Sequence, residues 1–104
     1  MYYYIIIIIY KILYKMIEVQ IKLIVRPDKL DDVLPMLYED KQKSLSNTIF
    51  SEFNIKNKNN KIEIIARCES MDKLSQHMIE THYRWKDLKD NGSIISQSHR
   101  FITL

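Results

Sequence analysis

From residue 17 onward, hydrophobic and polar side chains follow two periodicities, which predict strands and helices in turn. Residues 17–23 alternate apolar and polar side chains, the period of two that marks a strand with one buried face. Residues 48–55, 61–67 and 94–104 supply three more strands, and the middle of 61–67 is apolar on both faces, as in a central strand. The asparagine-rich residues 56–60 predict a polar turn that joins the second and third strands as a hairpin.

Two stretches between the strands carry apolar side chains three and four residues apart, the spacing of an amphipathic helix. The apolar stripe of the first helix consists of Leu30, Val33, Leu34, Leu37 and Tyr38. Asp28 is predicted to cap this helix, and Pro35 within it predicts a kink or an uneven start. The second helix is predicted to start after Ser70, its N-cap, and to run to about Leu88, before Gly92.

The order strand-helix-strand-strand-helix-strand predicts a ferredoxin-like α+β fold. Strict alternation along the second strand places Phe50 on one face and Ile49, Phe53 and Ile55 on the other. The helices are expected to cover one face of the sheet and to leave Ile, Phe and Val side chains on the other face in need of burial. We therefore expect a homodimer in which two sheets pack face to face.

The first sixteen residues form a low-complexity run of Tyr, Ile and Lys, distinct from the domain predicted for residues 17–104. The uninterrupted apolar part ends at Lys11, short of the roughly 18–20 residues that span a bilayer, and the features of a secretory signal are missing. We favour a dispensable leader, with Met16 as a candidate start, over a membrane or signal anchor or an extension of the first strand. A cytoplasmic location is expected, with membrane anchoring through residues 1–16 as the alternative.

Composition argues against several classes of function. A net charge of +3 is too small to mark a nucleic-acid binder, and residues 61–67 lack the aromatic side chains that RNA-recognition modules of this topology use. A single glycine, Gly92, excludes a glycine-rich phosphate loop. The one cysteine, Cys68, rules out an internal disulfide, and we expect it to pack in the core rather than to act as a reactive thiol beside Arg67.

The second helix concentrates the side chains that could carry chemistry. One helical stripe contains Met71, Leu74, Met78, His82 and Trp85. At about 100° per residue, this stripe places His82 on the buried face and His77 on its flank, about 90° away. The two histidines diverge by roughly 140° and cannot both chelate one ion, and His99 on the last strand could join only one of them. We therefore expect no metal site.

The segment from Leu74 to His77, followed by His82 and Tyr83, resembles the antibiotic biosynthesis monooxygenase family. Members of that family show Leu-x-x-His, four further residues, and then His-Phe or His-Tyr. The turn at residues 26–29 and the amphipathic helix after it also fit the family pattern. The resemblance covers about residues 17–104.

The resemblance implies a dimeric α+β barrel that oxygenates quinol-like or polyketide phenols with O2, without metal, haem or flavin. A base must deprotonate such a phenol, because the anion can pass an electron to O2 where the neutral molecule cannot. On this basis His77 is the candidate base, and His82, Tyr83, Arg67 and Trp85 are candidate orienting or donor groups. The implied partners are a small-molecule substrate, O2 and a second copy of the chain.

Two segments depart from the family pattern. Ala66 and Cys68 stand where the family has Glu-x-Trp, and residues 47–49 replace a Glu-Pro-Gly-like turn. Some relatives instead isomerise a small signalling sugar derivative or cleave haem, although the haem-cleaving pattern is not evident here. We predict a cofactor-independent monooxygenase, with an isomerase or a non-catalytic barrel that binds an apolar ligand or a protein as alternatives. A closed apolar cavity beside His77 and His82 would favour the enzyme.

Overall fold

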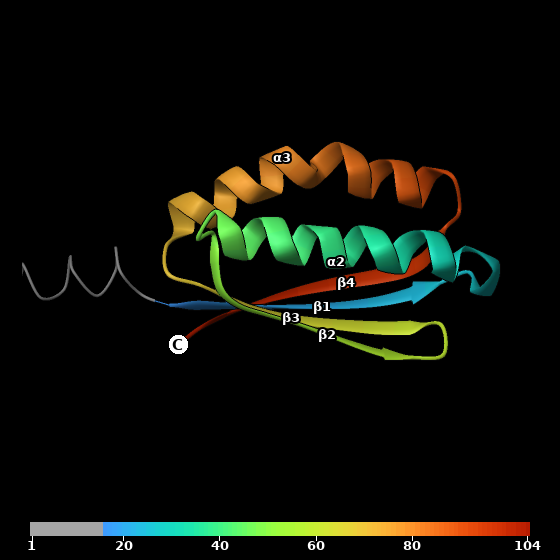
Figure 1. Ribbon diagram of the computed structural model, residues 1–104, viewed down its shortest axis with the longest axis horizontal. Coiled ribbons are helices and arrows are strands. Elements are labelled where there is room, and N and C mark those ends of the chain that lie inside the picture. The colour runs from blue at the N-terminus through green and yellow to red at the C-terminus, as the bar shows by residue number, and fades with distance from the viewer. Residues whose placement is uncertain (1–15) are drawn as a thin grey trace, which may run out of the picture.

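The computed structural model describes residues 16–104, which form a four-stranded antiparallel sheet with two helices on one side (Figure 1). The elements are β1 (Ile17–Val25), the short 3-10 helix η1 (Pro27–Lys29), α2 (Leu30–Ser46), β2 (Phe50–Lys58), β3 (Lys61–Cys68), α3 (Met71–Asp90) and β4 (Ile94–Thr103). The strand order is β2-β3-β1-β4. The predicted ferredoxin-like α+β fold is therefore confirmed.

The leader predicted for residues 1–16 lies, except for Met16, outside the described residues. Between residues 16 and 104, no helix is both long enough and apolar enough to cross a lipid bilayer.

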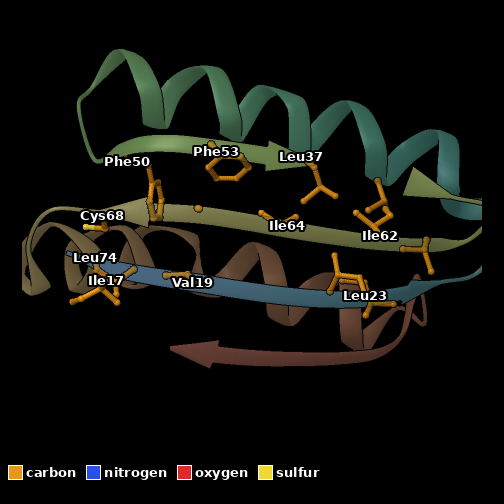
Figure 2. Close-up of a cluster of buried hydrophobic side chains, with 14 residues drawn as sticks. Ile17, Val19, Leu23, Leu37, Phe50, Phe53, Ile62, Ile64, Cys68 and Leu74 are labelled. Atoms are coloured by element: carbon orange, nitrogen blue, oxygen red, sulfur yellow. The ribbon is translucent and has the colours of Figure 1, made fainter. Parts of the chain in front are cut away.

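The core lies between the helices and the inner face of the sheet, which is the face toward α2 and α3. In β1, Val19 and Leu23 are buried on this face, and their neighbours in β3 are Ala66 and Ile62. Figure 2 shows the side chains of the central strands β1 and β3 lying along this face, with α2 and β2 closing one side of the cluster. The alternation predicted for β1 and the hairpin predicted for β2 and β3 are confirmed.

The start of the first helix differs from the prediction. Pro27 opens the 3-10 turn η1, where its missing N–H costs no helical hydrogen bond. The Asp28 carboxylate accepts two hydrogen bonds from the Arg26 guanidinium, at 3.1 and 2.7 Å. Lys29 occupies the N-cap position of α2 without a side-chain cap. The prediction that Asp28 caps the helix was wrong, because this carboxylate pairs with a nearby cation instead.

The helix α2 continues through Pro35, which is exposed to solvent. Its fully buried positions are Val33, Leu37, Asp40 and Ser44. Tyr38, which was predicted to belong to the buried stripe, is exposed. The buried face of α2 is therefore rotated away from Tyr38 and contains polar positions that a hydrophobic pattern cannot identify.

The strand β2 departs from strict alternation at its start. The pairing of β2 with β3 shifts in register between Phe50 and Glu52, which is the mark of a β-bulge. The extra residue brings Phe50 and Phe53 onto the same inner face, where they are 4% and 7% exposed and their rings meet edge to face at 5.5 Å. The prediction that Phe50 lies on the opposite face was wrong, because a bulge is invisible to a strict period of two.

The outer face of the sheet, which points away from both helices, is largely polar. Register and alternation assign to it Glu18, Gln20, Lys22, Glu52, Asn54, Lys56, Lys61, Glu63, Arg67, Ser96, Ser98 and Arg100, with Ile24, Ile65 and Ile102 between them. Arg67 Nε lies 3.3 Å from a carboxylate oxygen of Glu18 and 3.9 Å from one of Glu52. The premise of an apolar outer face was therefore wrong, since alternation and the bulge send most apolar side chains inward. The homodimer stays a prediction.

Candidate functional site

A cavity of about 380 Å³ lies between the inner face of the sheet and the two helices. Its lining comprises Val19 and Ile21 of β1, Leu37 and Asp40 of α2, Phe50 and Phe53 of β2, Ile64 and Ala66 of β3, Leu74, His77, Met78, Thr81, His82 and Trp85 of α3, and Gln97, His99 and Phe101 of β4. Most of these side chains are apolar, and the volume is in the range of small-molecule pockets. A cavity beside His77 and His82 is therefore present, although it is open to solvent and not closed as the sequence-based criterion required.

The floor of the cavity is formed by β1 and β3, and Ala66 of β3 has the smallest side chain among the floor residues. Ala66 pairs with Val19 on one side and with Phe53 on the other. Its methyl group leaves space where a larger inward-facing side chain would reach toward the helices. Figure 2 shows Phe50, Phe53, Leu37 and Ile64 on the α2 side of this floor. The floor thus supplies an apolar surface and no acid or base.

The wall formed by α3 is rotated relative to the predicted stripe. Leu74 and Thr81 are buried, His77 is half-buried and His82 is exposed. The prediction that His82 is buried and His77 lies on the flank was therefore reversed, and the two predicted core methionines, Met71 and Met78, are exposed. Several sets of residues in α3 have helical spacing, so periodicity alone does not predict which set faces the sheet. Thr81 and His77 are polar, and only the packed structure shows that they lie on the inner side of the helix.

The imidazole of His77 is fixed on the inner side of α3. Its ring meets that of Phe50 edge to face, with the ring centres 5.0 Å apart. The Thr81 hydroxyl donates a hydrogen bond to the backbone oxygen of His77 at 2.9 Å, so this buried hydroxyl is satisfied within the helix. The contact with Phe50 places the ring at the cavity wall rather than in open solvent.

Burial lowers the pKa of His77 below its usual 6.5, because removing water disfavours the charged imidazolium. The carboxylates of Asp40 and Glu80 oppose this change, and the Arg84 guanidinium adds to it. Asp40 is itself buried and pairs with Arg84 by a salt bridge and hydrogen bond. His77 is therefore neutral near pH 7 and able to accept a proton.

The wall formed by β4 contributes Gln97, His99 and Phe101, which alternate along the strand and face inward. The ring centres of Trp85 and His99 lie 6.1 Å apart in an edge-to-face arrangement. Burial lowers the pKa of His99, although part of its surface remains exposed. The side-chain oxygen of Gln97 is buried and accepts no hydrogen bond from the described residues. The amide of Gln97 is thus an unmatched polar group beside the cavity.

The cavity reaches solvent between α3 and β4 and is not closed. The lining residues on this side that are exposed are Met78 and His82 of α3 and His99 and Phe101 of β4. The lining residues from α2, β2 and β3 are all buried. A small molecule would therefore pass between two imidazoles on its way to the interior.

The structure brings together three of the five residues that the sequence proposed for the site. His77, His82 and Trp85 line the cavity, whereas Tyr83 is 75% exposed and Arg67 lies on the outer face of the sheet. Tyr83 contacts His82 from outside, with ring centres 5.6 Å apart. Neither Tyr83 nor Arg67 can contact a molecule inside the cavity in this arrangement.

The sequence did not identify the site residues contributed by α2 and β4. Asp40 was not assigned to the buried face of its helix, Gln97 was not proposed as a site residue, and His99 was considered only as a possible metal ligand. Alternation along the last strand places Gln97, His99 and Phe101 on one face, and this signal could have found them. Asp40 had no such signal, because a carboxylate within a helix is normally exposed.

The cysteine has a structural explanation. Cys68 is buried and its thiol donates a hydrogen bond to the Ser70 backbone oxygen at 2.9 Å, as expected for a packing residue. Within the part of the chain that the structure describes, no group of three or more His, Cys, Asp or Glu side chains is arranged to hold a metal ion.

Solved structures share this fold. A proposed antibiotic biosynthesis monooxygenase from Deinococcus radiodurans superimposes with a TM-score of 0.73 at 8% identity, over 83% of this chain and 89% of its own. A second one, from Nitrosomonas europaea, gives a TM-score of 0.69 at 14% identity, over 88% and 89% of the two chains. A Bacteroides thetaiotaomicron protein of unknown function, named a possible oxidoreductase, gives 0.71 at 11% identity, over 88% and 99%.

No family model matches the chain. No curated protein matches it either. At these low identities the structural similarity defines the fold alone, and it is the fold of the antibiotic biosynthesis monooxygenases. The expectation of that fold from the spacing of His77, His82 and Tyr83 is confirmed.

Proposed function

We propose that this protein is a monooxygenase that oxidises a small quinol- or phenol-like molecule with O2 inside the cavity, with His77 as the base. The observation that carries the proposal is the half-buried imidazole of His77 on the wall of a largely apolar cavity of about 380 Å³. Burial lowers the pKa of this imidazole and keeps it neutral, the form that a base requires. The resemblance of the second helix to the monooxygenase family and the shared fold support the assignment.

The reaction begins when neutral His77 accepts the proton of a bound phenol. The phenolate is electron-rich and gives one electron to O2, after which the two radicals combine into a hydroperoxide on a ring carbon. Loss of water then leaves a carbonyl, so that one oxygen atom enters the product and the other leaves as water. Both hydrogens of that water come from the substrate, and the balance therefore needs no external reductant.

The surrounding side chains have supporting roles in this proposal. His82 at the opening and the indole N–H of Trp85 are candidate donors to the developing oxyanion, since both line the cavity. The apolar floor offers water no hydrogen-bond partner and gives O2 an apolar surface. The proposal does not extend to Tyr83 and Arg67, which were candidate binding groups but do not line the cavity.

The decisive experiment measures O2 uptake with anthrone as substrate and compares the protein with His77→Ala. Loss of a general base lowers kcat about 100-fold to 10,000-fold. Tyr83→Phe is the matched control on the same helix and retains the original rate, because its side chain lies outside the cavity. Incorporation of one ¹⁸O atom per product from ¹⁸O2 identifies a monooxygenase rather than an oxidase.

Undiminished turnover by His77→Ala would reject the role of His77. Binding of anthrone without O2 uptake in the unchanged protein would identify a non-catalytic ligand-binding barrel instead.

We propose in addition that two copies of the chain associate through their sheets, as the dimeric barrel of the resembling family implies. The outer face carries Ile24, Ile65 and Ile102, all half-buried among polar neighbours. Sedimentation equilibrium should give twice the chain mass of 12.6 kDa, and Ile65→Asp should shift the distribution toward single chains. A single-chain mass at millimolar concentration would contradict the dimer.

A further inference from the structure

Asp40 is the one acidic side chain that lines the cavity. It is 6% exposed and lies on the buried face of α2. Burying a carboxylate is unfavourable unless a counter-ion accompanies it. That counter-ion is Arg84 of α3, whose guanidinium donates a hydrogen bond to Asp40 Oδ1 and forms a salt bridge with it. The ion pair therefore joins the two helices at the wall of the cavity.

Arg84 and His77 lie on the same side of α3. They are seven residues apart, which is about two helical turns or roughly 10 Å along the axis, so their side chains leave the helix in nearly the same direction. Thr81, between them, is buried on this side. Helical side chains lean toward the N-terminus of the helix, so the Arg84 side chain extends toward His77. The Asp40–Arg84 pair is thus held on the side of α3 from which His77 faces the cavity.

The charges that act on His77 come from the two helices. After burial, which lowers the pKa of His77, the largest effect is that of the Asp40 carboxylate, which raises this pKa. Glu80 of α3 raises it as well, and Arg84 lowers it. Asp40 is therefore the charged group to which the ionisation of His77 responds most.

The other elements around the cavity add no further charge near pH 7 to its lining. The lining side chains of β1, β2 and β3 are all apolar. From β4, Gln97 is uncharged, and burial lowers the pKa of His99 so that its imidazole is neutral. His82 of α3 is exposed at the opening. The Asp40 carboxylate is thus the fixed negative charge of the cavity wall.

Such a charge matters most after the proton has moved. When His77 takes the proton of a bound phenol, the O–H bond breaks and an N–H bond forms, which leaves a phenolate and an imidazolium. A half-buried imidazolium has lost part of its hydration, and a fixed carboxylate replaces some of that stabilisation. The neutral imidazole of the resting protein gains little from the same carboxylate. An interaction that strengthens during the reaction raises kcat rather than affinity.

We propose that Asp40 stabilises the imidazolium that His77 becomes as it takes the substrate proton, and that Arg84 holds the Asp40 carboxylate in the cavity wall for this role. Both are positioning residues, because they act through His77. The catalytic part rests on the proposed function, whereas the coupling between Asp40 and His77 exists in the resting protein.

The test follows the titration of His77 by proton NMR, with its imidazole signal assigned by its absence in His77→Ala. Asp40→Asn removes the negative charge at nearly the same size, so the pKa of His77 should fall. Arg84→Met keeps the aliphatic stem without the positive charge, so this pKa should rise. A pair that only holds the helices together would admit water to His77 in both variants and move both values upward.

Asp31→Asn is the matched control, because it makes the same change at an exposed position of α2 and should leave the pKa of His77 unaltered. Arg84→Lys keeps the positive charge and should restore the value lost in Arg84→Met. A raised or unaltered pKa in Asp40→Asn would overturn the proposal, as would a lowered one in Arg84→Met. If Arg84→Met does not fold, the contrast between Asp40→Asn and Asp31→Asn decides the matter.

Kinetics test the catalytic part separately. Above the pKa of His77, Asp40→Asn should lower kcat for anthrone-dependent O2 uptake about 10-fold, as for coupling between neighbouring groups, and leave KM unchanged. An unchanged kcat would refute a role of Asp40 in the reaction. The NMR titrations need no substrate, so a protein without monooxygenase activity would still show the coupling. Conversely, a missing coupling would leave His77 as the base.

Discussion

The two helices of this protein lie on the same face of the sheet but fill the space beneath them differently (Figure 1). The shorter helix α2 buries four residues, whereas the longer α3 buries only Leu74 and Thr81. The other residues of α3 that are shielded from solvent are only partly buried, and they are His77, Arg84, Trp85 and Leu88. The side under α2 is therefore packed, and the side under α3 is hollow.

This difference shows how one sheet supports both stability and chemistry. A packed interface gains free energy from every buried apolar contact, whereas a cavity forgoes those contacts along its lining. The elements that border the cavity on the α3 side also contain all three histidines of the chain, His77, His82 and His99. Stability is thus expected to reside mainly on the α2 side, and ligand binding on the α3 side.

The largest expected effect follows from truncating one buried side chain of α2. Leu37 is 1% exposed, so Leu37→Ala should lower the free energy of unfolding by about 2–5 kcal/mol. Met78→Ala on α3, where the side chain is 47% exposed, should lower it by about 0.5 kcal/mol. Urea unfolding of both variants measures the contrast. Equal losses would show that α3 packs as firmly as α2.

The next effect concerns the pH dependence of O2 uptake. Only neutral His77 can accept a proton, so kcat/KM should fall as the pH is lowered through the pKa of His77. Burial lowers this pKa, and the midpoint is therefore expected below 6.5. Asp40→Asn removes the carboxylate that opposes the burial effect, so its midpoint should lie at still lower pH. A midpoint above 6.5 in the unchanged protein would contradict a buried neutral base.

The smallest effect is expected on the outer face of the sheet. Arg67 pairs there with Glu18 and Glu52, and exposed ion pairs of this kind contribute little to stability. Arg67→Ala should therefore leave anthrone-dependent O2 uptake unchanged. A loss of O2 uptake without a loss of stability would show that Arg67 contributes to the reaction, which its position on the outer face of the sheet does not explain.

Local patterns in the sequence predicted most of the fold. The alternation of β1, the polar turn after β2 and the capping serine Ser70, whose side chain accepts a hydrogen bond from the Lys73 backbone at 3.3 Å, all depend on neighbouring residues. The bulge at Phe50 and the pairing of Asp28 with Arg26 escaped prediction. A bulge is defined by the register of β2 with another strand, which local sequence does not contain. A carboxylate before a helix can accept a hydrogen bond either from a backbone N–H or from a nearby cation, and Asp28 accepts from Arg26.

The candidate site was predicted less completely than the fold. Spacing identified His77, His82 and Trp85 as a group, but the roles of the two imidazoles as inner and outer residues were reversed. Asp40 and Gln97 come from other elements and meet the cavity only through packing. No local pattern predicts the spatial distance between Asp40 of α2 and Gln97 of β4, which are 57 residues apart in the chain.

The sequence by itself determined the order of elements, the amphipathic character of both helices and the histidines available for chemistry, because these properties arise from side chains a few residues apart. Only the tertiary structure decided which face of α3 meets the sheet, and with it that His77 rather than His82 is half-buried. The physical reason is that the burial of His77, and the pKa that follows from it, depends on atoms contributed by α2 and β2, which are distant in the sequence. The same holds for the side-chain oxygen of Gln97, which is buried and unpaired only because separate elements pack around it.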